Sequence, residues 1–265
     1  MMKQALYTSN ISLEIGHFSL NKISASIPEG KITGIVGPNG SGKSTLLRIL
    51  SNLQKPDDGY IVIDEKSIKD YKGKELAQTL AMMPQAKSSL PNITVKELVQ
   101  FGRSPYKGYF RSNSHQQDEQ IVEWALRLTN TEHFANRMFH TLSGGEQQKV
   151  RIALALVQKA PILLLDEPTT FLDITHQIEV MELVETINRE EKMTIVMVLH
   201  ELQQAASYCD YLVVMKNGAI AQAGKPKELL TSSFLKDIYD IEAKVKYEEG
   251  YPLIIPIKGK QKVNI

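Results

Sequence analysis

A glycine-rich segment that ends in lysine and serine carries the clearest chemistry in this sequence. Residues 37–44 read Gly-Pro-Asn-Gly-Ser-Gly-Lys-Ser between a short apolar run and a helical pattern, as in a phosphate-binding loop. Glycines let the backbone N–H groups turn toward phosphate oxygens, and the following helix adds the positive end of its dipole. We expect Lys43 to reach the β- and γ-phosphates of ATP, Ser44 to offer a hydroxyl to Mg²⁺ and Thr45 to bind the α-phosphate. The predicted ATP-binding residues are Gly37, Pro38, Asn39, Gly40, Ser41, Gly42, Lys43, Ser44 and Thr45.

Two acids follow the apolar run Ile162–Leu165. Strand ends of a parallel sheet point into the crevice beside such a loop, so Asp166 is expected to hold Mg²⁺, directly or through water. Glu167 leaves the strand in another direction and is the candidate general base for an attacking water. The alternative is a carboxylate pair that only caps the next turn, and the phosphate loop disfavours it.

An amide and an imidazole complete the predicted catalytic set. Gln85 follows the apolar run 80–83, and its amide can coordinate Mg²⁺ and orient water. His200 follows the run 194–199, where a neutral imidazole could donate to the γ-phosphate and hold Glu167 in line. The predicted catalytic residues are Lys43, Gln85, Glu167 and His200, and the predicted Mg²⁺ ligands are Ser44, Gln85 and Asp166. The remaining histidines are interpreted as surface or structural: His17, His115, His133, His140 and His176.

The run Leu142–Glu146 forms a second candidate anion site. A serine followed by two glycines at a helix start offers free N–H groups to a negative ligand. Since this chain already has one phosphate loop, we interpret the second site as a contact to the γ-phosphate held by another copy. Two copies would then pack head to tail around two shared ATP molecules. The residues expected to act across that interface are Ser143, Gly144, Gly145, Glu146 and Asp173.

The order of apolar runs predicts an α/β fold with a phosphate-loop NTPase core. Strands and helices alternate after residue 31, which favours a mostly parallel sheet with helices on both faces. Weak alternation in residues 1–30 predicts an antiparallel β layer. Expected helices lie at 43–52, 94–102, 116–128, 143–159, 174–189 and 201–208, with a hairpin turn at 217–218. We expect one ATPase domain over residues 1–265, with a core at 1–85 and 161–225, a helical insert at 86–160 and an appendix at 226–265.

Composition narrows the class of protein. The formal net charge of +1 gives no basic surface for nucleic acid, so we expect no nucleic-acid partner. The apolar runs are far shorter than the roughly 20 residues of a membrane span, and the N-terminal region has no apolar signal segment. Cys209 is the single cysteine, which excludes an intrachain disulfide and fits a reducing compartment.

Taken together, these motifs resemble the nucleotide-binding subunit of an ABC transporter. In that family they correspond, in order, to the Walker A loop, Q-loop, signature motif, Walker B motif, D-loop and switch histidine: Gly37–Thr45, Gln85, Leu142–Glu146, Leu165–Pro168, Leu172-Asp173 and His200. The resemblance implies ATP and Mg²⁺ as cofactors. It also implies a second ATPase subunit as partner, expected to be an identical chain in a homodimer. It also implies membrane permease subunits, an extracellular substrate-binding protein acting indirectly, and a peripheral place on the cytoplasmic face of the cell membrane.

Finer features resemble one branch of that family, the importers of ferric siderophores, with haem and cobalamin importers as neighbours. They are Gly102–Tyr106, Glu167–Ile174, His176-Gln177, Gln203–Ala206, Pro252-Leu253 and Pro256. Two positions depart from the family pattern: Ile15 or Gly16 stands where an aromatic residue usually stacks on adenine, with Phe18 as a substitute, and Glu146 stands where glutamine is commoner. The resemblance adds import and a metal-chelate substrate to the ATPase.

The sequence fits two other functions less well. A non-transport ABC ATPase that acts on nucleic acid, ribosomes or an assembly scaffold is disfavoured, because the chain has no second cassette, long coiled coil or basic linker. A phosphate-loop kinase would have no use for Leu142–Glu146. The identity of the chelate is left open, because substrate choice in such systems lies in the permease and the binding protein.

Overall fold

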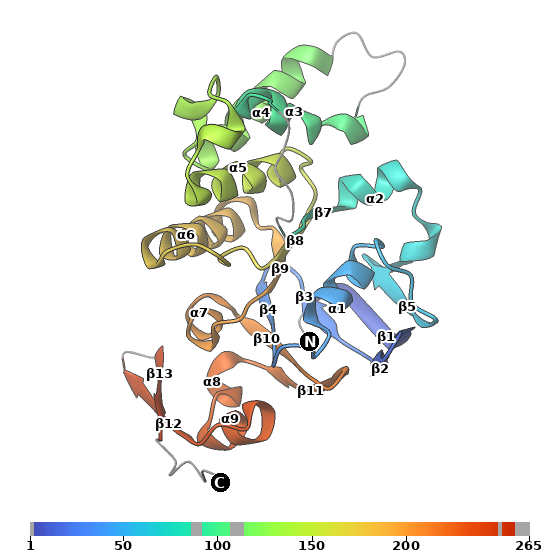
Figure 1. Cartoon of the computed structure of the whole chain (residues 1–265). Coiled ribbons are helices and arrows are strands. Elements are labelled where there is room, and N and C mark those ends of the chain that lie inside the picture. The colour runs from blue at the N-terminus through green and yellow to red at the C-terminus, as the bar shows by residue number, and fades with distance from the viewer. Residues whose placement is uncertain (1–2, 86–91, 107–113, 249–250, 258–265) are drawn as a thin grey trace.

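The structure is a computed structural model that describes residues 3–85, 92–106, 114–248 and 251–257. Its centre is a six-stranded sheet in the order β11-β10-β4-β9-β8-β7 (Figure 1). Five strands run parallel, and β11 is antiparallel to β10 at one edge. The strands are β4 (Ile32–Val36), β7 (Leu80–Met83), β8 (Ile162–Asp166), β9 (Thr194–Val198), β10 (Tyr211–Lys216) and β11 (Ala219–Gly224). This arrangement confirms the predicted mostly parallel sheet.

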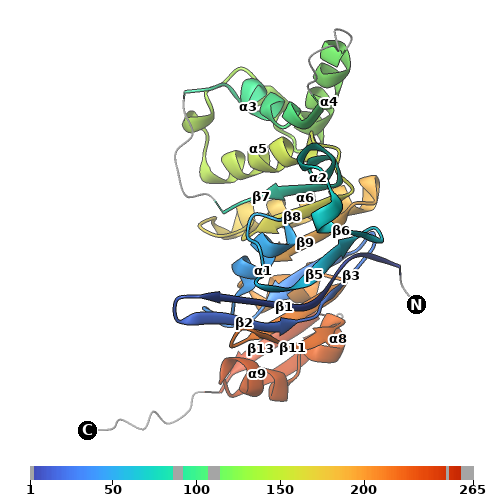
Figure 2. The same ribbon diagram turned by 90° about the vertical axis from the view of Figure 1, so that its right-hand side faces the viewer.

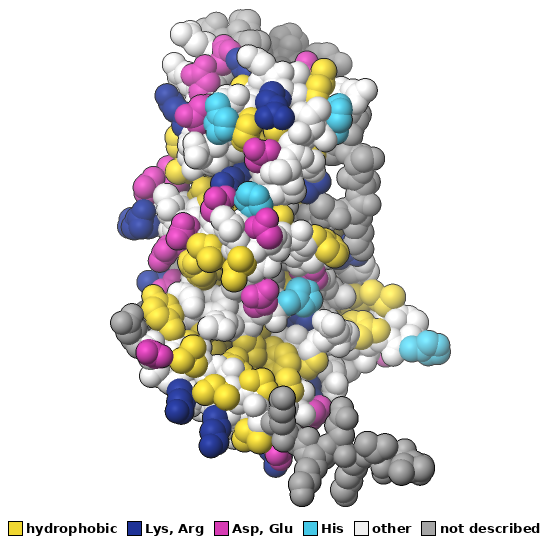
Figure 3. All heavy atoms as spheres, turned by 60° about the vertical axis from the view of Figure 1, so that its left-hand side comes forward, with side chains coloured by type: hydrophobic (Ala, Val, Ile, Leu, Met, Phe, Trp, Pro, Cys, Tyr) yellow, Lys and Arg dark blue, Asp and Glu magenta, His cyan; other side chains and the backbone are white. Residues whose placement is uncertain are grey.

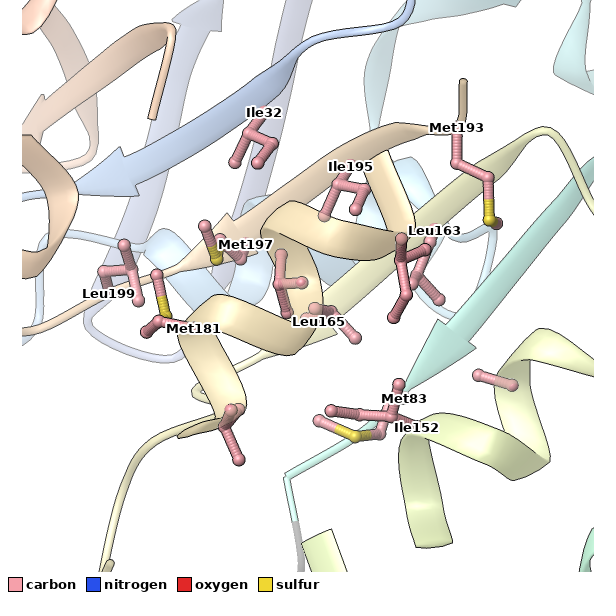
Figure 4. Packing of buried hydrophobic residues seen from close by; sticks show 14 of the residues in the cluster. Ile32, Met83, Ile152, Leu163, Leu165, Met181, Met193, Ile195, Met197 and Leu199 are labelled. Carbon is pink, nitrogen blue, oxygen red and sulfur yellow. The ribbon is translucent and has the colours of Figure 1, made fainter. Parts of the chain in front are cut away.

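Both faces of the central sheet are buried. Every residue of β4, β8 and β9 is buried, which is typical of strands covered on two sides. Successive residues of β8 alternate between two cores: Ile162 and Leu164 face one, and Leu163 and Leu165 face the other. On the second face, Met181 of α6 (Ile174–Glu191) packs in the same cluster as the strand residues (Figure 4).

The N-terminal strands form a separate antiparallel sheet in the order β2-β1-β5-β6, and β3 pairs with β1 (Figure 2). Its strands are β1 (Gln4–Ile15), β2 (Phe18–Ile23), β3 (Ser26–Pro28), β5 (Asp58–Ile63) and β6 (Lys66–Ser67). The sheet packs with α1 (Lys43–Leu50) against the face of the central sheet opposite α6. The antiparallel layer expected from residues 1–30 is therefore confirmed.

Three helices gather beyond the β7 edge of the central sheet, at the top of Figure 1. They are α3 (Val95–Phe101), α4 (Ser114–Leu128) and α5 (Gly144–Leu156), and α5 packs against both others. Thr94 caps α3 through a reciprocal bond pair with Glu97, which is why the helix begins there. Short 3₁₀ turns connect this part of the chain: η2 (Ser104–Tyr106), η3 (Glu132–Phe134) and η4 (Phe139–Thr141). Between the helices expected at 94–102 and 116–128, residues 107–113 lie outside the described residues.

The chain after β9 completes the sheet and adds a small C-terminal unit. It begins with α7 (Leu202–Tyr208) and ends with α8 (Pro226–Leu229), α9 (Ser232–Tyr239), β12 (Ala243–Glu248) and β13 (Tyr251–Pro256). Asn217 and Gly218 both have positive φ and join β10 to β11, as the predicted hairpin turn requires. Among the described residues, no helix combines the length and the hydropathy needed to cross a membrane.

One helix has no counterpart among the predicted elements. Helix α2 (Gly73–Thr79) follows the 3₁₀ turn η1 (Ile68–Asp70) and buries none of its residues. Its Leu76 is only partly buried against the core, and a single apolar contact gives no period in the sequence, so periodicity could not reveal the helix. The strand β6 is only two residues long and gives no pattern either.

Candidate nucleotide-binding site

The loop between β4 and α1 forms a cradle at the carboxyl end of the central sheet. Gly37 has φ 149°, and a Cβ atom there would lie 2.0 Å from the backbone oxygen of Met215 on β10. Gly42 has φ 101°, and a Cβ atom there would lie 2.8 Å from the Phe18 ring. Only glycine fits these two places, so the backbone can curl tightly around a ligand.

The lysine of the loop is folded into this cradle. Lys43 is 5% exposed, and its Nζ donates to the carbonyl oxygens of Gly37 at 2.9 Å and Pro38 at 3.0 Å. Burial lowers the pKa of Lys43, and the negative charge of Glu167 partly opposes that shift. A partly desolvated ammonium beside neutral carbonyls is suited to a strong anionic ligand such as phosphate.

A cavity of 420 Å³ opens at the mouth of this loop. It is lined by Phe18, Asn39, Gly40, Gly42, Lys43, Ser44, Thr45, Glu167 and His200. These residues come from the phosphate loop, from the turns after β8 and β9, and from the antiparallel sheet. Cavities at the carboxyl ends of parallel strands are the usual ligand sites of α/β sheets. The lining fits a nucleoside triphosphate, because the phosphate loop and the aromatic ring of Phe18 line the same space.

Glu167 is held by three side chains, two of which come from distant parts of the chain. His200 Nε2 lies 2.7 Å from Oε1, and Gln85 Nε2 donates to Oε2 at 2.6 Å. Thr170 Oγ1 also donates to Oε2, at 3.0 Å. Burial raises the pKa of Glu167, but the hydrogen bonds from His200 and Thr170 and the charges of His200 and Lys43 outweigh it. The pKa therefore lies below its ordinary value, and the carboxylate stays ionised and fixed.

The backbone at Glu167 is strained as well. Its φ of 54° lies in the left-handed region, which costs a non-glycine residue energy. This turn directs the Glu167 side chain into the cavity, whereas the preceding Asp166 stays 4% exposed at the end of β8. The two adjacent acids thus occupy different environments, as their predicted roles require.

The second candidate anion site lies at the N-terminus of α5. Ser143 caps the helix: its Oγ accepts from the Glu146 N–H at 3.3 Å, and its own N–H donates to Glu146 Oε2 at 2.8 Å. The hydrogen bond from the Ser143 backbone is the main cause that lowers the pKa of Glu146. Within one chain, residues 143–146 are not among the described residues that line the cavity beside Lys43.

Comparisons with known proteins agree with this geometry. A family model described as ABC transporter matches residues 20–170, more than half of the chain. The chain belongs to the ABC transporter family. It is 45% identical over 245 residues to the petrobactin import ATP-binding protein FpuC of Bacillus anthracis, covering 92% of this chain and 90% of that protein. It is 39% identical over 250 residues to the ferric enterobactin transport ATP-binding protein FepC of Escherichia coli (strain K12), covering 93% and 92%.

A solved structure gives the same result at the level of the fold. An inward-facing ABC transporter described as of the metal-chelate type superposes with a TM-score of 0.83 at 27% identity. The match covers 96% of this chain and 98% of that one. The phosphate-loop NTPase fold with its helical part is therefore confirmed, and the chain is an ATP-binding cassette.

The cassette brings together most of the residues that the sequence singled out. Lys43, Glu167 and His200 share the cavity, and Gln85 joins them through its bond to Glu167. Asp166 lies on the same strand end, β8, whose neighbour β9 leads into His200.

Two contacting residues were not anticipated from the sequence. Thr170 binds the Glu167 carboxylate, and its i, i+3 spacing across the turn that contains Pro168 is a signal that could have indicated it. Gln148 on α5 donates to the Pro168 carbonyl at 2.8 Å. The latter contact joins residues 20 apart in the chain, so no local pattern reveals it.

Replacing Gly37 with alanine is expected to destabilise the cassette. The added Cβ would overlap the Met215 carbonyl and strain a left-handed backbone, so we expect a loss of about 3 kcal/mol of unfolding free energy. Thermal and denaturant unfolding measure this change. Gly73→Ala is the matched control, because nothing lies within 4 Å of its Cβ position and α2 should gain slightly from alanine. Equal stabilities of the two variants would contradict the close approach of β10 to the loop.

Proposed function

We propose that this chain is the ATP-hydrolysing subunit of an importer of metal chelates, with ferric siderophores as the most suitable substrates and haem and cobalamin as related ones. The relatives FpuC and FepC carry names of petrobactin import and ferric enterobactin transport, which supports this substrate class. The observation that carries the proposal is the split site. One chain holds a cavity with Lys43, Glu167 and His200, and a separate capped helix start at Ser143 that does not line it.

In the proposed reaction, Gly37–Thr45 binds the phosphates of ATP, and Lys43 stabilises the charge that builds on the γ-phosphate. Glu167 accepts a proton from the attacking water, since its carboxylate is ionised and held in place. His200 and Gln85 orient Glu167 through the bonds described above. The oxygens of Ser44, Gln85 and Asp166 would hold Mg²⁺, which supplies neutralisation of phosphate charge when bound.

Two copies are proposed to pack head to tail, with Ser143, Gly144, Gly145, Glu146 and Asp173 meeting the nucleotide of the other copy. The large apolar residues beside Asp173 support a covered surface there: Phe171 is 92% exposed and Ile174 is 74% exposed in the single chain. The γ-phosphate would join the two copies, and its removal would let them separate.

The membrane partner is proposed to be a permease on whose cytoplasmic face the cassette lies, with an extracellular binding protein acting through it. On the face in Figure 3, acidic and basic side chains are interspersed rather than gathered by sign. This pattern supports a protein partner rather than nucleic acid. We retain, as a proposal, one ATPase domain with a core at 1–85 and 161–225, an insert at 86–160 and an appendix at 226–265. All described strands of the two larger sheets come from the core ranges, which supports this division.

Reconstitution tests the substrate class. The chain would be combined with candidate permeases in vesicles, and ATP-dependent uptake of a ferric siderophore, haem and cobalamin would be compared. We expect uptake of a ferric siderophore that is lost without the cassette. ATP hydrolysis that depends on a permease, with no uptake of any of the three chelates, would contradict the proposed substrate.

Ser143→Arg tests the split site separately. The bulky cation at the helix start should leave ATP binding to a single chain unchanged, because Ser143 does not line the cavity. Hydrolysis should fall at least about 100-fold, since the second copy can no longer dock at the γ-phosphate. Nucleotide titration and phosphate release measure the two effects. A loss of ATP binding itself would show that Ser143 acts within its own chain.

A further inference from the structure

Gly145, in the first turn of α5, packs directly against a histidine ring. A Cβ atom at Gly145 would lie 2.4 Å from Cγ and 2.6 Å from Nδ1 of His176 on α6. A Cβ atom at Gly144 would meet only Leu172 Cδ2, at an ordinary contact distance of 3.6 Å. The imidazole therefore packs against the backbone of Gly145. It limits how closely the start of α5 can approach α6.

The ring is itself held in place. His176 Nδ1 lies 3.2 Å from Glu179 Oε2, and Nε2 lies 4.0 Å from Asp173 Oδ2. The backbone N–H of His176 donates to Asp173 Oδ1 at 3.0 Å, so Asp173 both caps α6 and flanks the imidazole. Lys149 on α5 completes the arrangement, with Nζ 2.7 Å from Glu179 Oε2.

These contacts bridge the two segments proposed to face the other copy. Lys149 and Gly145 belong to α5, whose start carries Ser143, whereas His176 and Glu179 belong to α6, which begins after Asp173. The bond from Gln148 to the Pro168 carbonyl ties α5 to the same turn independently. The helix start and the Asp173 turn are thus coupled as one unit, with His176 at the point of contact.

We propose that His176 is a positioning residue that fixes the Gly144-Gly145 backbone relative to Asp173, so that both reach the nucleotide of a second copy together. This inference rests on the proposed head-to-tail dimer. His176 touches no residue that lines the cavity of its own chain among its described contacts, so its effect is confined to the shared site. The proposal gives a role to His176, which the sequence analysis interprets as a surface or structural histidine.

The first test measures ATP-dependent dimerisation in a Glu167→Gln background, in which hydrolysis is expected to be slow. We expect His176→Ala to weaken dimerisation about ten-fold or more, because a displaced start of α5 no longer meets the γ-phosphate. ATP affinity of the single chain should stay within about two-fold of the parent. His176→Gln, which can still pack and bond to Glu179, should restore most of the loss. Glu190→Ala, at an exposed residue near the end of the same helix, is the matched control and should change nothing.

A double substitution separates positioning from general loss of structure. Gly145→Ala alone should push the start of α5 away from the ring, whereas the same change combined with His176→Ala fills the space that the ring vacates. The double variant should therefore dimerise better than Gly145→Ala alone. Additive effects, or dimerisation of His176→Ala equal to the parent, would overturn the positioning role while leaving the dimer intact. Failure of the parent Glu167→Gln protein to dimerise with ATP would instead contradict the proposed function.

Discussion

Lys43→Ala is expected to weaken ATP binding strongly. The side chain is buried in the phosphate loop, where its ammonium is held by two carbonyl oxygens and its pKa is lowered by burial. A charge-assisted bond to phosphate in such a place contributes about 2 to 3 kcal/mol, so ATP affinity should fall about 100-fold. Calorimetric titration with ATP measures the loss, and phosphate release should fall with it.

The control for this change is an exposed lysine that does not line the cavity. Lys69 is exposed on the turn η1, and Lys69→Ala should bind ATP like the parent. Unfolding of the Lys43→Ala protein should remain cooperative, since the substitution removes a buried charge and leaves the glycine geometry of the loop in place. Unchanged turnover in Lys43→Ala would disprove the assignment of the phosphate loop.

Glu167→Gln is expected to separate ATP binding from ATP hydrolysis. An amide keeps the shape of the side chain and can still bond to Thr170 and His200, but it cannot accept a proton from water. Loss of a general base costs roughly 10²- to 10⁴-fold in rate, so phosphate release should fall by that factor while ATP binding persists. The unhydrolysed γ-phosphate should then hold two copies together as a stable dimer.

Analytical ultracentrifugation with and without ATP measures the dimer, and a phosphate assay measures turnover. Glu190→Gln, at an exposed residue near the end of α6, removes the same charge far from the cavity and should behave like the parent. A Glu167→Gln protein that stays monomeric with saturating ATP at high protein concentration would refute the shared site. Full hydrolysis in that variant would refute the role of Glu167 as base.

Glu167 also shows how the site balances opposing effects. Burial alone would raise the pKa of Glu167, because it disfavours the charged carboxylate. The bonds from His200 and Thr170 reverse that shift, which keeps the base ionised at neutral pH at the cost of some proton affinity. Displacement of these partners would therefore raise the pKa of Glu167, and the stability contributed by its ionised form would be lost as pH falls through the folded pKa.

The sequence by itself determined the phosphate loop, because all nine of its residues are contiguous and the strand, turn and helix that shape them are local. It also determined the central strands, since strands buried on both faces appear as unbroken apolar runs. Helix α2 was not predicted, because its single partly buried leucine, Leu76, gives no apolar period to detect.

Only the tertiary structure decided which side chains surround Glu167. Gln85 lies 82 residues before it, and His200 follows a different strand, so their meeting depends on the order in which β7, β8 and β9 pair. The contact between Gly145 and His176 could not be predicted from the sequence either, because it arises from the packing of α5 on α6. Local conformation follows from nearby residues, whereas contacts across a sheet or between helices follow from packing that no single segment encodes.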